Sequence, residues 1–332
     1  MRSMQLSHPQ AAETNPLQMT EGDPITAISP RGLLLRVRAC GVCHTDLHLV
    51  EGELAPRKLP IIPGHQVIAT VERVGAEVTR FGLGDRVGVP WLHSTCGQCS
   101  FCQGGQENLC DDARFTGWDI DGGYAEVMAA DEGAAVAIPP GFTDAAAAPL
   151  LCAGIIGFRS LRLAGAREGM TIGLFGFGAS AHIALQVARY WGCEVYAFTR
   201  SAAHRSQAEA LGAAWTGTAE QTPPHRLDCA ILFAPAGALV PLALGRLRKG
   251  GTLAINAIHM SPIPGLDYAL LYGERTLRSI TNATRQDAEE FLQLASQMAI
   301  RTEFQVFPLA EANRALLAVK HSQVRGAAVL EI

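Results

Sequence analysis

Thiol and imidazole side chains at three separated positions are candidates to hold a catalytic metal ion together. Cys43 and His65 lie near each other in the sequence, and thiolate sulfur and neutral imidazole nitrogen are ligands that zinc prefers. Cys152, between the two halves of the chain, is the third candidate. Three protein ligands leave one coordination position open, as a catalytic zinc requires. Each residue alone is more often part of a core, but a ligand at Cys152 predicts a site in a cleft between domains, where pockets concentrate.

Four further cysteines form the strongest metal-binding pattern in the chain. The sequence reads Cys96-Gly-Gln-Cys99-Ser-Phe-Cys102, and Cys110 follows a pair of glycines. Two residues between successive cysteines allow the backbone to aim the sulfurs at one point, and four thiolates close a tetrahedral zinc site, so this zinc is structural. The spacing and the expected compartment disfavour unrelated thiols or a disulfide. An iron–sulfur cluster stays an alternative, although the chain lacks a second cysteine cluster of that type.

A glycine-containing turn has the features of a dinucleotide site. It follows the expected strand 171–175, precedes the expected helix 181–191 and consists of Gly176, Phe177, Gly178, Ala179, Ser180 and Ala181. Two glycines permit a tight turn and a close approach of the backbone to a pyrophosphate at the helix N-terminus, and the third position accepts glycine or alanine. The strand–turn–helix setting favours dinucleotide binding over a purely structural turn.

The end of the following strand predicts which dinucleotide is bound. An NAD site usually offers Asp or Glu about 20 residues after the turn, where the carboxylate binds the ribose 2′-hydroxyl. Here Thr199, Arg200 and Ser201 occupy that position, and no acid precedes Glu209. Two hydroxyls and a guanidinium suit a 2′-phosphate, so NADP(H) is favoured over NAD(H). The alternative is that Arg200 is only a solvated surface residue, as most arginines are.

Composition narrows the remaining possibilities. With 332 residues, 48% hydrophobic and 17% charged, the chain can form about two domains with large cores. A net charge of −4 gives no general basic surface for nucleic acid or anionic lipid. The longest nearly apolar run, 145–158, is shorter than the roughly 17–25 residues of a membrane helix. Residues 1–9 lack the apolar core of a secretory signal, so we expect the protein in the cytoplasm. Nine cysteines in a chain without such a signal favour metal ligation over disulfides.

The pattern of hydrophobic residues changes near residue 150 and predicts an α/β protein with two kinds of sheet. Before about residue 150, short segments with glycine and proline turns predict a mostly antiparallel β unit, and after it apolar strands alternate with helices, which predicts a parallel βαβ sheet. We expect strands at 32–39, 67–71 and 85–89, then at 171–175, 194–199, 227–233 and 251–256, and a helix at 287–298. The expected domains are 1–152, with a zinc lobe at 96–110, and 153–286, with 287–332 returning to close the first.

In their order along the chain, these motifs resemble the zinc-dependent medium-chain dehydrogenases of the alcohol dehydrogenase type. The matches cover most of the chain and include Cys43-His-Thr45-Asp46-Leu-His48, Pro63-Gly-His65, Val74-Gly75, Gly84-Asp-Arg-Val87, the four-cysteine lobe, Asp121-Gly-Gly-Tyr124-Ala-Glu126, Pro149-Leu-Leu-Cys152 and the turn at Gly176. The resemblance implies a GroES-like catalytic domain joined to a Rossmann domain, usually in homodimers or homotetramers.

The resemblance also implies roles for individual residues. Thr45 matches the hydroxyl that takes the alcohol proton, His48 the base at the end of that relay, and Asp46 the carboxylate that orients His65. Trp91 and Trp118 resemble walls of the substrate pocket, although both are equally compatible with a core. Two zinc ions per subunit are implied, the catalytic one on Cys43, His65 and Cys152 and the structural one on Cys96, Cys99, Cys102 and Cys110.

Three positions depart from the pattern of the family. Gln66 stands where Glu is usual, which removes a negative charge near the zinc. Ala181 replaces the third glycine of the turn, which the packing argument tolerates. The segment Gly326–Val329 lacks an arginine that many relatives carry after the glycine, and whether Arg325 takes its place is open. No zinc ligand or relay residue is lost, so activity is expected.

The expected reaction interconverts alcohols and aldehydes or ketones. Zinc polarises the substrate oxygen, hydride passes to or from the nicotinamide, and the proton leaves through Thr45, a ribose hydroxyl and His48. A polyol or aromatic-alcohol dehydrogenase is an alternative within the family. A non-catalytic zinc-ribbon and nucleotide-sensing protein is an alternative from another class. The relay residues, the open site and the lack of a basic cluster beside the four cysteines count against it.

Overall fold

The chain crosses between two units twice. The computed structural model describes residues 1–332, of which Met1–Cys152 and Asn282–Ile332 form the first unit and Ala153–Thr281 the second. The return begins at 282, earlier than the expected 287. The reason is local, because Arg285 donates from its backbone N–H to Glu107 and from Nε to the Gly133 carbonyl, at 2.8 Å each. The start of the last-but-one helix is thereby bound to the first unit.

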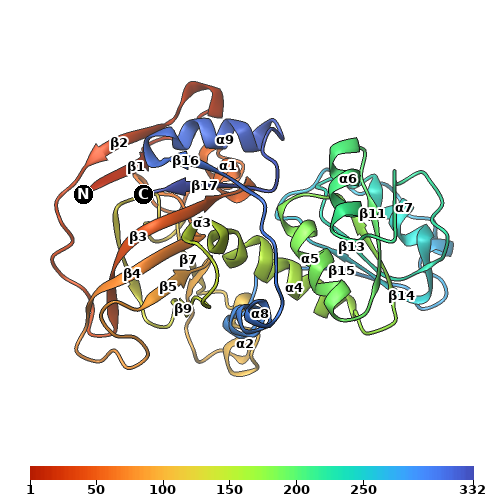
Figure 1. The fold of residues 1–332 in the computed structure, drawn as a ribbon, viewed down its shortest axis with the longest axis horizontal. Coiled ribbons are helices and arrows are strands. Elements are labelled where there is room, and N and C mark those ends of the chain that lie inside the picture. The colour runs from red at the N-terminus through yellow and green to blue at the C-terminus, as the bar shows by residue number, and fades with distance from the viewer. The chain divides into compact units, whose positions relative to one another are not determined.

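A seven-stranded sheet organises the first unit. Its order is β16-β17-β3-β4-β5-β9, with β8 also paired to β3, and every pair except β16 with β17 is antiparallel. The expected antiparallel β unit is confirmed, and the C-terminal strand lies beside β3 with Leu330 opposite Cys40 (Figure 1). The strands are β3 (Gly32–Val42), β4 (Val67–Val74), β5 (Arg86–Val89), β8 (Val127–Asp131), β9 (Val136–Ala137), β16 (Phe304–Pro308) and β17 (Ala327–Glu331).

Two small sheets and five α-helices complete this unit. The sheets pair β1 (Arg2–Leu6) with β2 (Leu17–Glu21) and β6 (Leu92–Ser94) with β7 (Arg114–Phe115). The helices are α1 (His44–Glu51), α2 (Ser100–Gln103), α3 (Asp144–Ala147), α8 (Arg285–Gln297) and α9 (Ala312–Lys320). The strands β6 and β7 are missing from the sequence expectation because two or three residues are too few to show an alternation.

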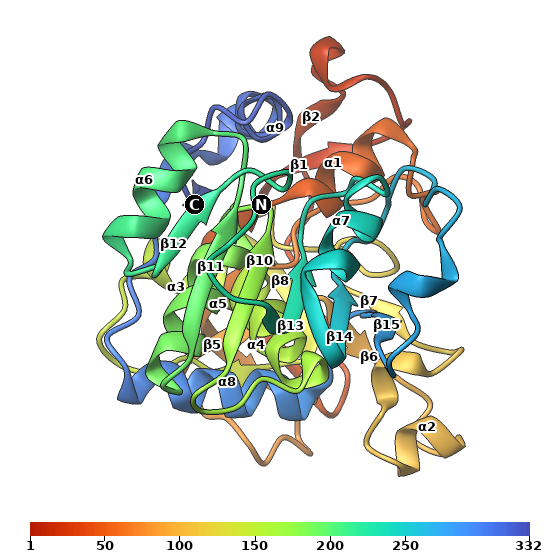
Figure 2. The ribbon, with the colours of Figure 1, turned by 90° about the vertical axis from the view of Figure 1, so that its right-hand side faces the viewer.

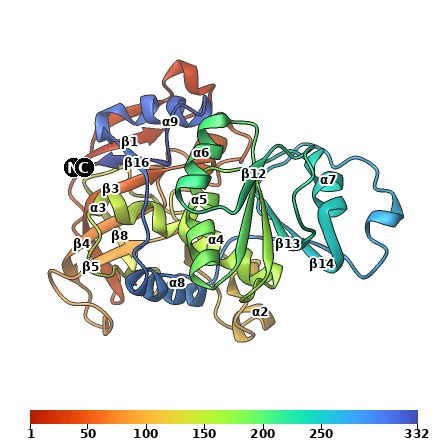
Figure 3. The same ribbon diagram turned by 45° about the vertical axis from the view of Figure 1, so that its right-hand side comes forward.

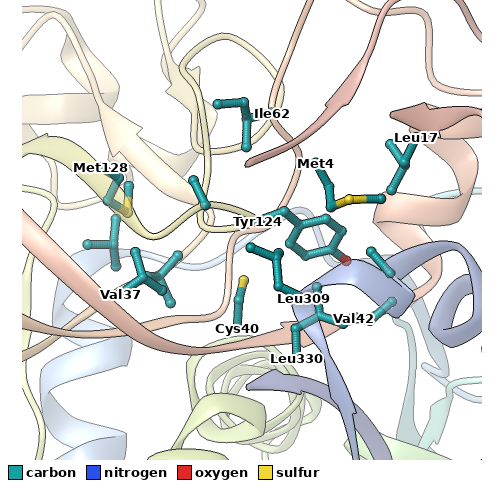
Figure 4. Close-up of a cluster of buried hydrophobic side chains, with 14 of the residues drawn as sticks. Met4, Leu17, Val37, Cys40, Val42, Ile62, Tyr124, Met128, Leu309 and Leu330 are labelled. Carbon is teal, nitrogen blue, oxygen red and sulfur yellow. The ribbon is translucent and has the colours of Figure 1, made fainter. Parts of the chain in front are cut away.

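The core of the first unit closes around the ring of Tyr124. This ring is fully buried and lies among Met4, Cys40 and Leu309, which come from distant parts of the sequence (Figure 4). A bond of 2.8 Å from the Met4 backbone N–H to the Tyr124 carbonyl fixes β1 at this place. Burial of apolar surface contributes about 25 cal/mol per Å², so the N-terminal strand and the C-terminal segment stabilise the same core.

Six parallel strands form the sheet of the second unit. Their order, β12-β11-β10-β13-β14-β15, is that of a Rossmann sheet (Figure 2). The strands are β10 (Thr171–Phe175), β11 (Glu194–Phe198), β12 (Trp215–Gly217), β13 (Leu227–Leu232), β14 (Leu247–Ile255) and β15 (Thr276–Ser279). The sequence expectation found the four long strands but not β12, which has three residues, or β15, whose side chains are mostly exposed at the edge of the sheet.

Helices cover both faces of this parallel sheet. They are α4 (Ala153–Ala164), α5 (Ala179–Tyr190), α6 (Ala202–Ala210) and α7 (Leu239–Arg246). Figure 3 shows α5 and α6 on one face and α7 on the other, which is the doubly wound arrangement. The expected combination of a mostly antiparallel β unit and a Rossmann sheet is confirmed.

One stretch of 21 residues, Asp144–Ala164, is long and apolar enough to cross a membrane by its length and composition alone. It is not a continuous α-helix, because a 3-10 turn at Ala148–Leu151 with Pro149 separates α3 from α4. Of its most apolar part, 67% is buried in the protein. The helices of a protein core can have the same length and apolar composition as a membrane span, and this segment is packed in such a core.

Candidate active site and metal centres

The N-terminus of α1 places the first candidate metal ligand. Cys43 is the N-cap residue, and its Sγ accepts a hydrogen bond of 3.3 Å from the Thr45 backbone N–H. The Asp46 carboxylate in turn accepts one of 2.9 Å from the Cys43 backbone N–H. These reciprocal bonds form a capping box, which satisfies donors that the helix itself leaves unpaired. The helix start therefore fixes the sulfur of Cys43 and the carboxylate of Asp46 together.

The other end of α1 is held by a cluster of charged groups. Lys320 of α9 lies 2.7 Å from Glu51, the last residue of α1, and 2.8 Å from Glu13. Burial alone would raise the pKa of Glu51, but the Ala12 backbone N–H and the Lys320 ammonium outweigh it and lower that pKa. With both ends bonded, α1 is a rigid support for its side chains.

The structure brings Cys43, His65 and Cys152 together, with their ligand atoms all within 4.8 Å of one another. Cys43 Sγ lies 3.3 Å from His65 Nε2. A tetrahedral zinc with Zn–S of about 2.3 Å and Zn–N of about 2.0 Å separates such atoms by roughly 3.5 Å, so the donors have nearly the spacing that zinc needs. The donors thus fit a zinc ion held by three protein ligands.

A carboxylate stands behind the imidazole of this cluster. Asp46 Oδ1 lies 3.2 Å from His65 Nδ1, and both side chains are almost completely buried. Burial would lower the pKa of His65, but the Asp46 and Cys43 charges beside it prevail and raise that pKa well above its ordinary value. With Nδ1 directed at Asp46, Nε2 faces the sulfur and is the nitrogen available to a metal.

The Cys43 thiol of the cluster is disposed to ionise only beside a cation. The neighbouring Cys152 thiol and burial raise the pKa of Cys43 well above the usual range. A buried thiolate needs a positive partner, and a bound metal ion supplies one by deprotonating the thiol outright. Cys152 itself lies between the 3-10 turn 148–151 and α4, so the break in the apolar stretch exposes its sulfur to the cluster.

The four remaining candidate cysteines form a second, closed cluster. Cys96, Cys99, Cys102 and Cys110 lie within 4.8 Å of one another, and the Sγ atoms of Cys96 and Cys102 are 3.9 Å apart. That separation is near the roughly 3.8 Å expected for two sulfurs on one tetrahedral zinc and far from the roughly 2.05 Å of a disulfide. All nine cysteines of the chain are free thiols.

Backbone N–H groups prepare the sulfurs of this cluster for a cation. Cys96 Sγ accepts from the Cys99 N–H at 3.3 Å, and the N–H groups of Gln98 and Cys99 lower the pKa of Cys96 to about 7. The Cys102 N–H alone would lower the pKa of Cys99, but burial and the adjoining thiols outweigh it and raise that pKa to about 11. The Cys96 thiolate is thus formed readily, whereas the Cys99 thiol ionises when a metal ion neutralises its charge.

A stack of aromatic rings flanks the three-ligand cluster. Trp91 contacts the edge of His65, with ring centroids 4.9 Å apart, and stacks on Trp118 at 5.8 Å. Phe115 stacks on Trp91 at 5.1 Å, and the Arg57 guanidinium lies 4.1 Å above Trp118. Sequence reasoning named both tryptophans but missed Phe115, which carries no motif and reaches the site only through the pairing of β6 with β7.

The glycine turn of the second unit leaves the N-terminus of α5 open. Gly176 has φ +92°, and a Cβ there would lie 2.8 Å from the Ala234 backbone nitrogen. Gly178 is the N-cap residue and offers no side-chain cap, so the first N–H groups of α5 stay available to an anion. Ala179 and Ser180 open the helix, which begins two residues before the expected Ala181, and Ala181 is fully buried.

The residues expected at the ribose lie together at the end of β11. The Thr199 backbone is tied to Gly217 at 2.8 Å, and Ser201 caps α6 by accepting from the His204 N–H. Arg205 Nη1 donates to the Thr199 and Arg200 carbonyls at 2.9 Å each. These bonds hold the backbone of the loop in place, and the Arg200 side chain is exposed.

The positions that depart from the family pattern have identifiable surroundings. Gln66 is buried, and a Cβ on Gly41 would meet its side chain at 2.6 Å. Arg325 forms an ion pair of 2.7 Å with Glu303. In this structure the guanidinium of Arg325 is engaged by a carboxylate.

Comparison with known proteins agrees with the fold and the clusters. Residues 29–140 match the model of the alcohol dehydrogenase GroES-like domain, and residues 181–297 match the zinc-binding dehydrogenase model. A probable alcohol dehydrogenase AdhA of Mycobacterium tuberculosis is 47% identical over 100% of this chain and 97% of its own length. The chain belongs to the zinc-dependent medium-chain alcohol dehydrogenase family.

Two solved structures of this kind superpose over the whole chain. A cinnamyl alcohol dehydrogenase of Sorghum bicolor has a TM-score of 0.91 at 26% identity and covers 99% of this chain and 97% of its own. A cobalt- and zinc-bound alcohol dehydrogenase of Pyrobaculum aerophilum has a TM-score of 0.90 at 26% identity, with 100% and 99% covered. These likenesses over the whole chain agree with membership of that family.

Gly64, immediately before His65, generates a stability prediction. It has φ +101°, and a Cβ would overlap the Tyr124 ring and lie 2.8 Å from Cys40 Sγ. Gly64→Ala should lower the free energy of unfolding by about 2–5 kcal/mol, from left-handed backbone strain of about 1–2 kcal/mol and overpacking of about 1–3 kcal/mol. It should also weaken zinc retention, because His65 is displaced.

Gly84→Ala is the matched control for urea unfolding. Gly84 has φ +85°, but a Cβ added there would have no other atom within 4 Å, so only the backbone term of about 1–2 kcal/mol applies. If both variants lose the same free energy of unfolding, the close packing around Gly64 does not contribute to the cost of the added methyl group.

Proposed function

We propose that Cys43, His65 and Cys152 hold the catalytic zinc of an enzyme that interconverts alcohols and aldehydes or ketones. The observation that carries the proposal is the convergence of three donor atoms within 4.8 Å at the capped N-terminus of α1. Zinc, when bound, supplies a Lewis acid that polarises the substrate oxygen, and the nicotinamide supplies the hydride acceptor or donor. The chain itself contributes orientation and the path for the proton.

Thr45 and His48 are proposed to move that proton. Thr45 follows the cysteine ligand by two residues, and its hydroxyl can exchange a proton with a substrate bound beside the cluster. His48 lies three residues further on, on the same face of α1. Its side chain is 17% exposed, so the imidazole can pass a proton on to water. Asp46 acts through His65, whose ring it holds in place.

Thr45→Val tests this assignment. With the hydroxyl removed, turnover of a panel of aliphatic and aromatic alcohols should fall by about 10²–10⁴-fold, the usual size of a general acid–base contribution. Thr45→Ser keeps the hydroxyl and should keep most activity. The reduced nicotinamide is followed by absorbance with both cofactors. Turnover near the wild-type rate in Thr45→Val would remove the residue from the proton path.

Aromatic alcohols are a second candidate class of substrate. The stack of Trp91, Phe115 and Trp118 lies against His65, with the nearest ring centroids 4.9 Å apart. Offset-stacked aromatic pairs are worth about 0.5–1.5 kcal/mol beyond buried area, so an aromatic ring gains affinity at this wall. The comparison of aromatic with aliphatic alcohols in the panel decides between the classes.

Two zinc ions per chain are proposed, one in each cysteine-containing cluster. The Pyrobaculum aerophilum relative, which is cobalt- and zinc-bound, supports this, as do the spacings of the donors. That none of the nine cysteines forms a disulfide also supports a reducing compartment such as the cytoplasm.

Metal analysis of Cys43→Ala tests the stoichiometry. The variant should retain about one zinc per chain, because only the three-ligand cluster loses a donor. Cys229→Ala is the control, since Cys229 is a buried free thiol outside both clusters and should leave two zinc ions. Two zinc ions in Cys43→Ala, with the fold intact, would place that ion on other ligands.

NADP(H) is proposed as the preferred cofactor. The exposed side chain of Arg200 and the hydroxyls of Thr199 and Ser201 support binding of a 2′-phosphate through charge-assisted hydrogen bonds. No carboxylate stands at the end of β11 to bind a 2′-hydroxyl in the usual way. The open N-terminus of α5 supports binding of the pyrophosphate next to it.

Arg200→Ala should reduce the preference while leaving NADH kinetics nearly unchanged. A hydrogen bond to a charged group is worth about 1.5–3 kcal/mol, which corresponds to roughly 10–100-fold in kcat/KM for NADPH over NADH. Arg167→Ala, an exposed arginine of the same unit, is the control. An equal loss with both cofactors would locate Arg200 at a group they share, and a wild-type enzyme indifferent to the phosphate would contradict the preference.

A homodimer or homotetramer is proposed from the surface of the second unit. Four large apolar side chains of the segment 258–272 are exposed there, namely Ile258, Ile263, Tyr268 and Tyr272, and the edge strand β15 has one unpaired side. An unpaired strand edge and exposed apolar side chains are both suited to association with a second copy. Sedimentation should give a dimer or tetramer for the wild type and smaller species for Tyr268→Glu/Tyr272→Glu. A monomeric wild type would refute this.

A further inference from the structure

A carboxylate outside the expected relay is bonded to its terminal base. The helix α1 ends at Glu51, and Gly52, with φ +81°, turns the chain back on itself. The Leu54 backbone N–H then donates to the His48 carbonyl at 3.0 Å. This reversal brings the Glu53 side chain onto the imidazole of His48, where Glu53 Oε2 bonds to His48 Nδ1.

This bond determines which nitrogen of His48 carries a proton. An ionised carboxylate only accepts hydrogen bonds, so Nδ1 must be the donor. In a neutral imidazole the other nitrogen, Nε2, is then the acceptor. A proton arriving at His48 is accepted at Nε2, and the resulting positive charge lies against the carboxylate of Glu53.

Stability does not account for the pair. The Glu53 side chain is 48% exposed, and ion pairs with such exposure contribute little because water and salt screen them. The pair is nevertheless held by the backbone turn at Gly52, since both the helix end and the Leu54 bond constrain it. Because the backbone holds Glu53 next to His48, this carboxylate is suited to orienting the His48 imidazole.

We propose that Glu53 is a positioning residue that sets the tautomer of His48, so that Nε2 is the proton acceptor of the relay. The proposal rests on the proposed function, because it needs His48 to receive the substrate proton. Glu53 exchanges no proton with substrate and acts only through the imidazole. The arrangement has the logic of other catalytic histidines, whose second nitrogen is oriented by a carboxylate.

The tautomer is measured directly by nitrogen-15 NMR of histidine-labelled, zinc-loaded protein at alkaline pH, where imidazole is neutral. The signal of His48 is assigned by its loss in His48→Gln. In the wild type we expect a proton on Nδ1. Glu53→Ala should give a mixture of both tautomers, whereas Glu53→Gln keeps an acceptor oxygen and should keep most of the Nδ1–H form. Glu77→Gln removes an exposed acid elsewhere in the first unit and should change nothing.

Kinetics provide the second measurement. Alcohol oxidation by Glu53→Ala should have kcat lowered by about tenfold, the lower end of the range found when the carboxylate partner of a metal-ligating histidine is removed, with unchanged zinc content and cofactor KM. The solvent deuterium isotope effect on kcat should increase, because proton transfer becomes slower. In the His48→Gln background, Glu53→Ala should cause no further loss, since it acts through His48.

The two hypotheses fail separately. If His48 keeps one tautomer in Glu53→Ala, or carries its proton on Nε2 in the wild type, the role of Glu53 is refuted even in an active enzyme. An additional loss in the His48→Gln background refutes it as well. A wild type that oxidises no alcohol with either cofactor refutes the proposed function, and with it the relay, whereas the tautomer measurement still reports the pairing.

Discussion

The buried carboxylate of Asp46 is the constraint on which the candidate active site depends. It closes the capping box at Cys43 with a bond of 2.9 Å and lies 3.2 Å from Nδ1 of His65, while its own side chain is nearly inaccessible. A buried charge is tolerated only when it is paired and hydrogen-bonded. The same group therefore fixes a helix start, orients an imidazole and adds negative charge behind a cation site, so a change at Asp46 would disturb all three.

The two cysteine-containing clusters differ in how they are built. The four-cysteine cluster is largely a local product of one loop, in which the N–H groups of Cys99 and Cys102 donate to sulfurs three residues earlier. The three-ligand cluster gathers a helix N-cap, a residue after a left-handed glycine and a residue at a break between helices. Closed coordination suits a structural ion, and three ligands leave a position for chemistry. The four-cysteine cluster is therefore suited to a structural ion, and the three-ligand cluster is suited to an ion with an open coordination position.

The second unit presents complementary chemistry for a dinucleotide. Its glycine turn leaves helix N–H groups uncapped, and the end of β11 carries a guanidinium and two hydroxyls in place of a carboxylate. Positive partial charge at the helix and a full charge on Arg200 both favour phosphate. Arg205 supports the loop through backbone carbonyls, so the exposed arginine rests on a fixed base.

The sequence by itself determined the fold class and the long strands, and it singled out the seven candidate metal ligands that the structure groups as three and four, because alternation, glycine turns and cysteine spacing are local patterns. It did not determine short strands such as β12, the contact of Phe115 with Trp91, or the bond between Glu53 and His48. The first lacks enough residues to show a period. The second depends on pairing between strands separated by the zinc lobe, and the third on a left-handed turn at Gly52. Only the folded structure decided these features, since strand pairing between distant residues and a reversal of the backbone produce no periodic pattern in the sequence.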